Sequence, residues 1–387
     1  METYKLSDLC EILDSKRKPL SALQRAKKQG IYPYYGAQGI IDHLDEYLLD
    51  GEYLLVAEDG ANLETRNQPI ANIANGKIWV NNHAHVLGNN GKCPLNLLGF
   101  ILNNMNISPY VTGCAQPKLN QENLRNIEIE LPSHIDRIAS ILSSLDRKIE
   151  LNNKINADLE EMAQAIFKNW FVDFEPFKDG KFVDSELGMI PEGWKVGTLD
   201  EIADIVGGST PSKAKPEYYT QKGIAWLTPK DLSNHPAVYS SRGEIDITQE
   251  GYNSTSTKLM PKGTVLFTSR APIGYISIAQ NDICTNQGFK SVVPKKAGTC
   301  FLYCFLKYVT PEIENKSTGS TFKEASGALM KSLQVIMPEQ KVFEEFEAIV
   351  SPLFTRIESL EQESSRLSLL RDTLLPRLMS GELEVPE

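Results

Sequence analysis

The sequence predicts an α+β fold in which two mixed α/β units are joined by two long helices, packed as an antiparallel coiled coil with a pseudo-two-fold internal repeat. Two observations lead to this prediction. Two long stretches each carry one apolar stripe at helical spacing, and the segments before them resemble each other at both ends. A stripe of that length needs a partner, and each helix can supply one for the other.

The first predicted helix covers His134 to Trp170, a segment without proline or glycine. At about 1.5 Å per residue it would be roughly 55 Å long. Its apolar stripe consists of Ile138, Leu142, Leu145, Ile149, Ile155, Leu159, Met162, Ile166 and Trp170. A polar break at Asn152, Asn153 and Asn156 interrupts the stripe. This break either sets the register of the helix pair or marks a place where another subunit docks.

The second predicted helix covers residues 340–379. Its apolar positions are Val342, Phe346, Ile349, Leu353, Ile357, Leu360, Leu367, Leu370, Leu374 and Leu378. Pro352 and Pro376 conflict with a regular helix, so each is expected to kink it or to mark one of its ends.

The repeat appears when the chain is compared with itself. The segment Tyr4–Ile12 aligns with Trp194–Ile202, with Leu9 opposite Leu199, and Leu124–Pro132 aligns with Met330–Pro338. The chain order is therefore unit, helix, unit, helix. The predicted segments are 1–132 and 194–338 for the two units, 133–173 and 339–380 for the helices, and 174–193 for a connector.

Short apolar runs between glycine-marked turns predict the strands of both units. The candidates are Tyr53–Ala57 and Ile78–Val80 in the first unit, and Ile224–Leu227, Thr264–Phe267 and Tyr275–Ile278 in the second. Alternating apolar residues also predict a strand at the end of each unit, at Ile127–Leu131 and Leu333–Met337.

Charge and composition limit the possible functions. The 387 residues carry a net charge of −10, which predicts weak nucleic-acid binding by the chain alone. Much of this charge lies on the helical segments, with 7 basic against 10 acidic residues in 133–184 and 5 against 11 in 339–387. No apolar run approaches a membrane span, and the N-terminus has no signal pattern. The six scattered cysteines are expected to be free thiols in a reducing cytoplasm.

Catalytic signatures are missing from the sequence. It contains no phosphate-binding G-x-x-x-x-G-K-[ST] loop, no dinucleotide-binding G-x-G-x-x-G, no H-E-x-x-H, and no tetrad of the kind used by amino-methyltransferases. The pair His83 and His85 could hold a metal, but no cysteine or carboxylate stands at a matching spacing, so no metal site is predicted. The chain is not expected to be an enzyme.

The loops of both units carry side chains suited to reading DNA. Arg270 could bind guanine and Asn286 or Gln287 adenine, while Ser, Thr and Lys could bind phosphates. In the alignment, Asn82 and His83 stand where the second unit has Asn286 and Gln287. The predicted DNA-binding residues are Lys16, Arg17, Lys18, Tyr35, Gln38, Asn82, His83, Lys118, Ser209, Thr210, Lys213, Thr228, Lys230, Ser269, Arg270, Asn286, Gln287, Lys290 and Lys323.

Several segments resemble one known family, the specificity subunits of Type I restriction-modification systems. The segments that carry the resemblance are Tyr35–Asp42 with Asp50–Gly60, Ser185–Trp194, Ser269–Gly274 with Thr285–Lys290, and Leu374–Leu383. The resemblance covers nearly the whole chain. It implies two target-recognition domains that each read half of a bipartite double-stranded DNA target, and two helices that set the spacer between the halves.

The resemblance also implies partners. Two methyltransferase subunits would bind S-adenosylmethionine and methylate adenine, and a restriction subunit, a translocating nuclease, would join for cleavage. The chain itself would bind no cofactor, and the complex would act in the prokaryotic cytoplasm. Two alternatives are a coiled-coil adaptor with two ligand-binding modules that do not bind DNA, and a fused restriction-methylation enzyme. The second would require a methyltransferase domain, for which the sequence has neither room nor motif.

Overall fold

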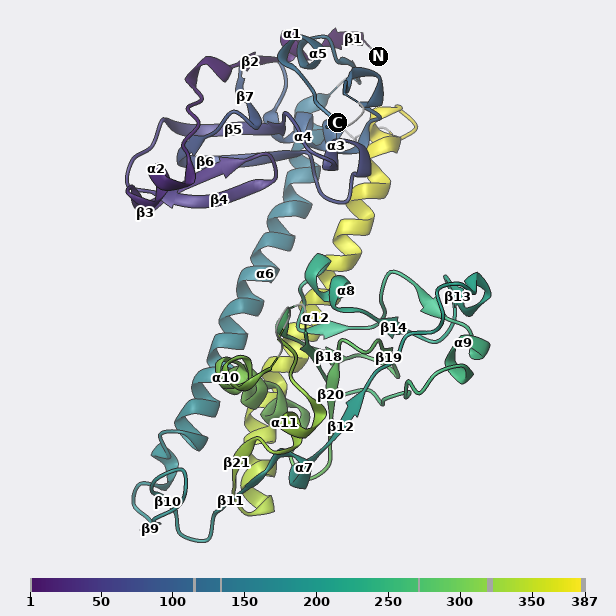
Figure 1. The fold of residues 1–387 in the computed structure, drawn as a ribbon. Helices are drawn as coiled ribbons and strands as arrows, with labels where there is room; N and C mark the ends of the chain where they lie inside the picture. Colours follow the sequence, from purple (N-terminus) through teal and green to yellow (C-terminus); the bar gives the residue numbers. More distant parts are fainter. Residues whose placement is uncertain (1, 114–115, 133, 271, 319–322, 384–387) are drawn as a thin grey trace. The chain divides into compact units, whose positions relative to one another are not determined.

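The structure is a computed structural model that describes residues 2–113, 116–132, 134–270, 272–318 and 323–383. Ser133, where the first predicted helical segment begins, lies outside the described residues. The chain forms two compact units. Unit 1 comprises Met1–Ile149 with Arg366–Glu387, and unit 2 comprises Glu150–Ser365. Each unit therefore combines one of the α/β segments with parts of both long helices (Figure 1).

Unit 1 is built on a six-stranded mixed sheet with the strand order β2-β7-β5-β6-β3-β4. Its strands are β2 (Cys10–Ile12), β3 (Gln29–Gly36), β4 (Gly39–Leu44), β5 (Leu49–Ala57), β6 (Ala71–Val80) and β7 (Ala84–Asn89). A separate antiparallel pair joins β1 (Glu2–Lys5) to β8 (Glu128–Leu131). The short helices are α1 (Leu6–Leu9), α2 (Ala22–Ala26), α3 (Asn62–Thr65), α4 (Leu95–Asn104) and α5 (Gln121–Arg125), with 3-10 turns η1 (Asp14–Lys16) and η2 (Ser108–Tyr110).

Unit 2 has a five-stranded sheet with the order β12-β20-β17-β18-β15. Its strands are β12 (Ala203–Gly207), β15 (Tyr239–Ser240), β17 (Val265–Ser269), β18 (Ile273–Ala279) and β20 (Lys290–Pro294). Four two-stranded pairs complete it: β9 (Phe182–Val183) with β10 (Ile190–Pro191), β11 (Lys195–Thr198) with β21 (Gln334–Met337), β13 (Tyr219–Thr220) with β16 (Asp246–Ile247), and β14 (Trp226–Leu227) with β19 (Cys284–Thr285). The helices are α7 (Leu199–Ile202), α8 (Pro229–Asn234), α9 (Gln249–Asn253), α10 (Thr299–Lys316) and α11 (Gly327–Lys331), with η3 (Glu175–Phe177) and η4 (Pro216–Tyr218).

The internal repeat is visible in the first elements of each unit. The order strand, one-turn helix, strand occurs as β1-α1-β2 and again as β11-α7-β12. In both, the residue before the helix donates its backbone N–H to a carboxylate of the first turn: Lys5 to Asp8 at 3.2 Å and Thr198 to Glu201 at 3.1 Å.

This geometry makes Leu6 the equivalent of Leu199. The sequence alignment, which placed Leu9 opposite Leu199, is wrong at this point. Leu6 and Leu9 lie on one face of α1, as Leu199 and Ile202 do on α7. Leu6 and Leu9 are three residues apart, as are Leu199 and Ile202. An alignment shifted by three residues therefore still placed a leucine, Leu9, opposite Leu199.

The two long helices are α6 (Ile135–Phe171) and α12 (Gln340–Met379). In unit 2, Phe171 near the end of α6 contacts Phe346 near the start of α12, with ring centroids 5.1 Å apart, whereas Asn152 earlier on α6 reaches Ser364 later on α12. The helices lie side by side and are antiparallel, which confirms the predicted packing (Figure 1). α12 continues through Pro352 and Pro376 without ending at either proline.

The stripe on α6 differs from the prediction in its buried members. Met162 is 51% exposed, while Phe167 and Phe171, which the predicted stripe omits, are almost completely buried. The polar break does not interrupt the buried face of α6, because Asn152 and Asn156 are themselves buried, with 0% and 8% exposure. The Asn152 amide donates to Glu363 at 2.9 Å and Ser364 at 3.3 Å. The helix pair thus encloses a polar layer in unit 2.

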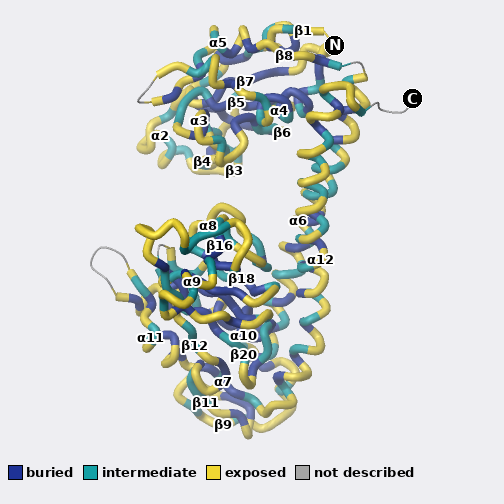
Figure 2. Tube along the Cα trace, turned by 90° about the vertical axis from the view of Figure 1, so that its right-hand side faces the viewer, coloured by how far each residue is buried: buried dark blue, intermediate teal, exposed yellow. Residues whose placement is uncertain are grey.

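Three predicted strands lie within β5, β6 and β18, and β8, β17 and β21 each cover all but the first residue of another. The prediction at Ile224–Leu227 is longer than the two-residue strand β14, because Ile224 makes only an isolated bridge to Ile247. The central strands β7 and β17 are almost completely buried, whereas β4 at the edge of the unit 1 sheet is largely exposed (Figure 2). Within the described residues, no helix is both long and apolar enough to cross a membrane.

Candidate nucleic-acid interface

In unit 2, seven of the predicted DNA-binding residues border one cavity of about 960 Å³. They are Thr210, Lys213, Thr228, Lys230, Arg270, Asn286 and Gln287. Strand pairing explains why residues so distant in sequence meet. β14 and β19 are parallel, so the chain leaves Leu227 and Thr285 at the same edge and presents the two following loops together. The loop after β17 adds Arg270 to them.

Hydrogen bonds shape the Asn286 loop and leave donors free for a ligand. Asn286 Oδ1 accepts the Gly288 N–H at 2.8 Å, which closes the turn and leaves the amide Nδ2 with no partner among the described residues. Gln287 Oε1 accepts the Thr210 hydroxyl and so joins two loops. An amide can pair with both N6 and N7 of adenine only if its oxygen is also available, so Gln287 would have to exchange Thr210 for the base.

Two basic residues of the cavity are well exposed and weakly paired. Arg270 is 36% exposed, with Nη1 3.6 Å from a Glu324 carboxylate oxygen. Lys230 is 70% exposed and lies 3.6 Å from Glu244. Exposed ion pairs of this kind contribute about 0–1 kcal/mol, so both cations can be redirected to DNA at small cost.

Other predicted residues of unit 2 have structural contacts. Ser269 is completely buried and its hydroxyl donates to the Gly288 carbonyl at 3.1 Å, so the prediction that it binds DNA is not supported by its position. Lys290 is 17% exposed and pairs with Glu324 at 3.4 Å. Lys323 donates to the Glu314 carbonyl at 3.2 Å, and the Ser209 carbonyl accepts from the Trp226 indole at 3.1 Å. None of these four lines the cavity.

The sequence prediction did not select several residues that line the same cavity. They are Pro216, Tyr219, Thr220, Gln221, Trp226, Pro229, Asp231, Glu244, Ile245 and Gly288. Asp231 was detectable from sequence, since Thr228-Pro-Lys-Asp231 has the spacing of an N-terminal capping box. The Asp231 carboxylate accepts both the N–H and the hydroxyl of Thr228 at 2.7 Å, so that hydroxyl is already occupied.

In unit 1 the equivalent loop begins one residue earlier than the sequence alignment predicted. Asn81 donates its N–H to the Tyr35 carbonyl at 3.0 Å, as Asn286 does to Leu227 at 2.9 Å. The Asn81 side chain also accepts the N–H two residues on, at 2.8 Å. Asn81 is therefore the equivalent of Asn286, and Asn82 the equivalent of Gln287. The predicted match of His83 with Gln287 is therefore wrong by one residue, because the shared hydrogen bonds align Asn81 and not Asn82 with Asn286.

An ionic network beneath this loop of unit 1 holds Arg17. Its guanidinium pairs with Asp14 at 3.2 Å and with Glu58 at 2.5 Å, and the side chain is only 15% exposed. His85, fully buried, contacts Asp14 at 2.6 Å through Nδ1 and the Leu119 carbonyl at 2.7 Å through Nε2. Burial alone would raise the pKa of Asp14, but the contacts with His85, the Val86 N–H and Arg17 outweigh it and lower that pKa. Arg17 and His85 therefore hold the loop, and Arg17 is not available to DNA in this conformation.

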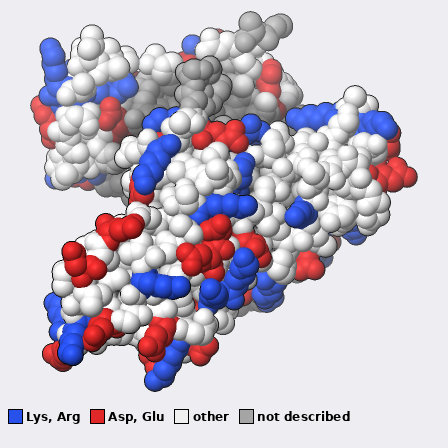
Figure 3. Space-filling model, turned by 60° about the horizontal axis from the view of Figure 1, so that its bottom comes forward, with Lys and Arg blue, Asp and Glu red and all other residues white. Residues whose placement is uncertain are grey.

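The remaining predicted residues of unit 1 lie nearer the surface. Lys118 pairs with Glu58 at 3.1 Å and is 52% exposed, and His83 pairs with Asp59 at 2.7 Å and is 50% exposed. The residues Lys16, Lys18, Gln38 and Asn82 are exposed and Tyr35 is half-buried. Within the part of the chain that the structure describes, no group of three or more His, Cys, Asp and Glu side chains could hold a metal ion. Lys and Arg alternate with Asp and Glu over the face in Figure 3, as expected for a weakly charged protein.

Comparison with known proteins gives the family. The model for the Type I restriction modification DNA specificity domain matches residues 1–161 and 191–368. The chain belongs to this family. As a Type I specificity subunit it is the target-recognition component of such a system, and it is not catalytic. The predicted family membership is confirmed.

Relatives of this specificity subunit are found in archaea and bacteria. The MjaIX specificity subunit of Methanocaldococcus jannaschii is 37% identical over 190 residues, which cover 48% of this chain and 44% of the relative. The HindI specificity subunit of Haemophilus influenzae is 26% identical over 330 residues, which cover 69% of this chain and 71% of the relative. The chain thus aligns with less than half of the first relative.

The solved structure of the S subunit of a Type I restriction-modification system from M. genitalium has the same fold. It matches with a TM-score of 0.59 at 17% identity and covers 97% of this chain and 95% of that one. At this identity the likeness concerns the fold alone.

Proposed function

We propose that each α/β segment of this specificity subunit reads one half of a bipartite double-stranded DNA target. The observation that supports this most directly is the cavity of unit 2, where four loops bring an arginine, two lysines and two amides to one place. Arg and Asn or Gln are the side chains that pair with the major-groove edges of guanine and adenine, and Lys binds phosphates. Unit 1 offers Lys16, Lys18, Gln38 and Asn82 on exposed loops for the same purpose.

The long helices would set the spacer between the half-sites. α6 has 37 residues and α12 has 40. At about 1.5 Å per residue, these lengths correspond to roughly 55 and 60 Å, more than the ~34–36 Å between half-sites one DNA turn apart. Inserting four residues between Asn152 and Ala157 is therefore expected to lengthen the recognised spacer and to leave both half-sites unchanged.

Catalysis would come from partners. Two methyltransferase subunits that bind S-adenosylmethionine would methylate adenine, and a translocating nuclease subunit would join for cleavage, in the cytoplasm of a prokaryote. Base methylation requires the adenine to leave the stack. The acidic, solvated faces of the helix pair are suited to docking the methyltransferase subunits.

Methylome sequencing of cells that carry the operon tests the proposal. We expect one bipartite motif that disappears when the gene for this chain is deleted, and one altered half-site when residues 1–132 are replaced by the corresponding segment of another specificity subunit. A motif that survives the deletion, or a replacement that changes both halves, would contradict it. An adaptor that does not bind DNA would give no salt-sensitive binding to duplex DNA with the methyltransferase present.

A further inference from the structure

The strand β6 of unit 1 is paired along its length on one side only. β5 covers it from Ala71 to Ile78, whereas on the other side β3 pairs with Trp79 and Val80 alone. The Ile78 carbonyl accepts the Leu48 N–H on the β5 side. Successive residues of a strand direct their backbone N–H and C=O groups to opposite sides, so the odd-numbered residues of β6 direct theirs away from β5. Ile73 and Asn75 are such residues, and no described part of the chain pairs with them there.

One amide shows what this edge accepts. The side chain of Asn103, on α4, takes the Ala71 N–H at 2.9 Å and donates to the Ala71 carbonyl at 2.8 Å. A neighbouring peptide would make the same two contacts with that residue. Asn103 thus closes the edge at Ala71, and the next two positions that face the same way, Ile73 and Asn75, stay open.

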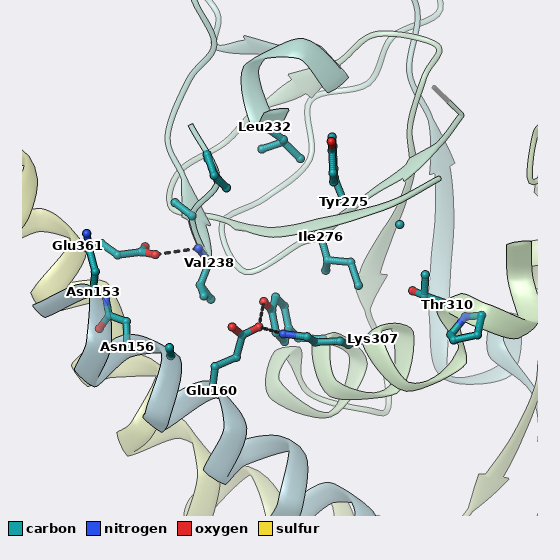
Figure 4. A pocket seen from close by; sticks show the side chains of 16 residues that line it. Asn153, Asn156, Glu160, Leu232, Val238, Tyr275, Ile276, Lys307, Thr310 and Glu361 are labelled. Carbon is teal, nitrogen blue, oxygen red and sulfur yellow. Dashed lines mark hydrogen bonds and ion pairs between the residues drawn. The ribbon is translucent and has the colours of Figure 1, made fainter. Parts of the chain in front are cut away.

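Unit 2 fills the equivalent edge with its own chain. Leu54 and Val265 hold equivalent positions in β5 and β17, and they pair with Ile73 and Ile278 respectively. β15 lies parallel beside Ile278, whose N–H donates to the Val238 carbonyl at 2.7 Å. Glu361 on α12 holds this added strand by accepting the N–H groups of Val238 at 2.7 Å and of Tyr239 at 3.0 Å (Figure 4). Unit 1 has no strand at this place among its described residues.

The first part of this edge, from Ala71 to Ile73, lines a cavity of about 440 Å³ in unit 1, and Asn75 lies outside the cavity lining. Its walls are rich in amides, contributed by Asn67, Gln68, Asn72, Asn96, Asn103 and Asn104. Two arginines and two aspartates line it, so its formal charges balance. Arg371 pairs with Asp146 and Asp372 at 2.7–2.8 Å, whereas Arg66 donates to the backbone carbonyls of Leu102 and Asn103 at 2.8 and 2.9 Å. The chemistry fits a polar, uncharged peptide better than an acidic or basic one.

We propose that the edge of β6 binds an extended polar segment of a partner subunit as an added parallel strand, with backbone hydrogen bonds at Ile73 and Asn75. The direction follows the parallel strand that unit 2 adds to its own sheet. Strand addition gives affinity through main-chain hydrogen bonds and protects an edge that would otherwise be available for unwanted pairing. The identity of the partner, the methyltransferase, rests on the proposed function.

Hydrogen exchange measured on the intact chain, alone and assembled with the methyltransferase, tests this inference. We expect the amides of Ile73 and Asn75 to exchange fast in the free chain and to become at least tenfold slower in the complex. Unchanged exchange in an assembled complex overturns the inference and leaves the proposed function intact, whereas failure to assemble contradicts the proposed function. Protection that appears with rising concentration of the chain alone would mean a second copy, and also overturns it.

A pair of variants at Asn75, whose side chain is exposed, separates backbone from side chain. Asn75→Pro removes the outward N–H and Asn75→Ala keeps it, so only the proline variant is expected to weaken assembly, roughly fivefold for one hydrogen bond lost. Equal affinities of the two variants for the methyltransferase would overturn the inference. If Asn75→Pro unfolds unit 1, the exchange experiment on the unmodified chain still decides.

Discussion

Replacing Arg270 by Ala tests whether the cavity of unit 2 recognises bases, because arginine is the residue of this cavity that can pair with guanine. Arg270 borders the cavity with Asn286 and Gln287, and its only described ion pair is the 3.6 Å contact with Glu324. That contact is worth about 0–1 kcal/mol at this exposure. A bidentate contact between arginine and guanine is worth about 1–3 kcal/mol of discrimination, so Arg270→Ala should reduce the preference at one base pair by roughly 5- to 150-fold.

The assay is binding of the assembled complex to a set of duplexes in which each position of both half-sites is varied in turn, supported by the methylome of the variant. Relaxed preference is expected at one position of one half-site. The control is Lys230→Ala, at an exposed lysine of the same cavity. It should weaken binding evenly across sequences and lower the salt slope by about 1.

A variant at Glu324 tests whether its contact with Arg270 weakens the binding of DNA. Glu324→Gln removes the carboxylate that competes with DNA for Arg270, and binding should tighten by up to about fivefold. The reasoning would be refuted if Arg270→Ala kept full preference at every position, or if it weakened all sequences equally as the lysine control does.

Three further predictions concern stability and the helix pair. Burial raises the pKa of Glu361 from its ordinary value of 4.5 to about 7, so the native state holds this proton more tightly than the unfolded state does. Stability should therefore fall by about 3 kcal/mol as pH rises from 4.5 to 7. Denaturant titrations should show that Glu361→Gln loses this part of the pH dependence. Phe346→Ala should lower the free energy of unfolding by about 3–5 kcal/mol, because the ring is fully buried among those of Phe167, Phe171 and Phe301. As a control, replacing the exposed Met162 by Ala should change it by less than about 0.5 kcal/mol. Asn152→Leu should leave thermal stability unchanged or raised, because Oδ1 of this buried amide has no partner among the described residues; a large loss of stability would show that its bonds to Glu363 and Ser364 outweigh the cost of burying it.

The sequence was informative wherever a pattern is local. Apolar spacing located both long helices, and alternation located the strands, because burial of one face imposes a period of 3.6 or 2 residues on the chain. The same spacing misled the alignment of the repeat, since Leu6 and Leu9 both match Leu199 by type. The starts of α1 and α7, and the hydrogen bonds of Lys5 and Thr198 to the carboxylates that follow them, distinguish the two registers.

Which polar residues are free to bind was decided by tertiary structure. By residue type alone, Arg17, Lys118, Arg270 and Lys230 are equally good candidates for binding DNA. Arg17, however, is enclosed by Asp14, three residues before it, and by Glu58, which comes from a distant segment of the chain. Sequence patterns do not report such pairings, because ionic contacts have no period.

The sequence by itself therefore determined the class of fold, the family and the helix pair, since these depend on apolar periodicity and on short motifs. Only the tertiary structure decided which loops share a cavity, which cations are already paired, and which strand edge stays open. These depend on pairing between residues far apart in the chain, such as the parallel contact of β14 with β19 and the missing neighbour of β6 beside Ile73.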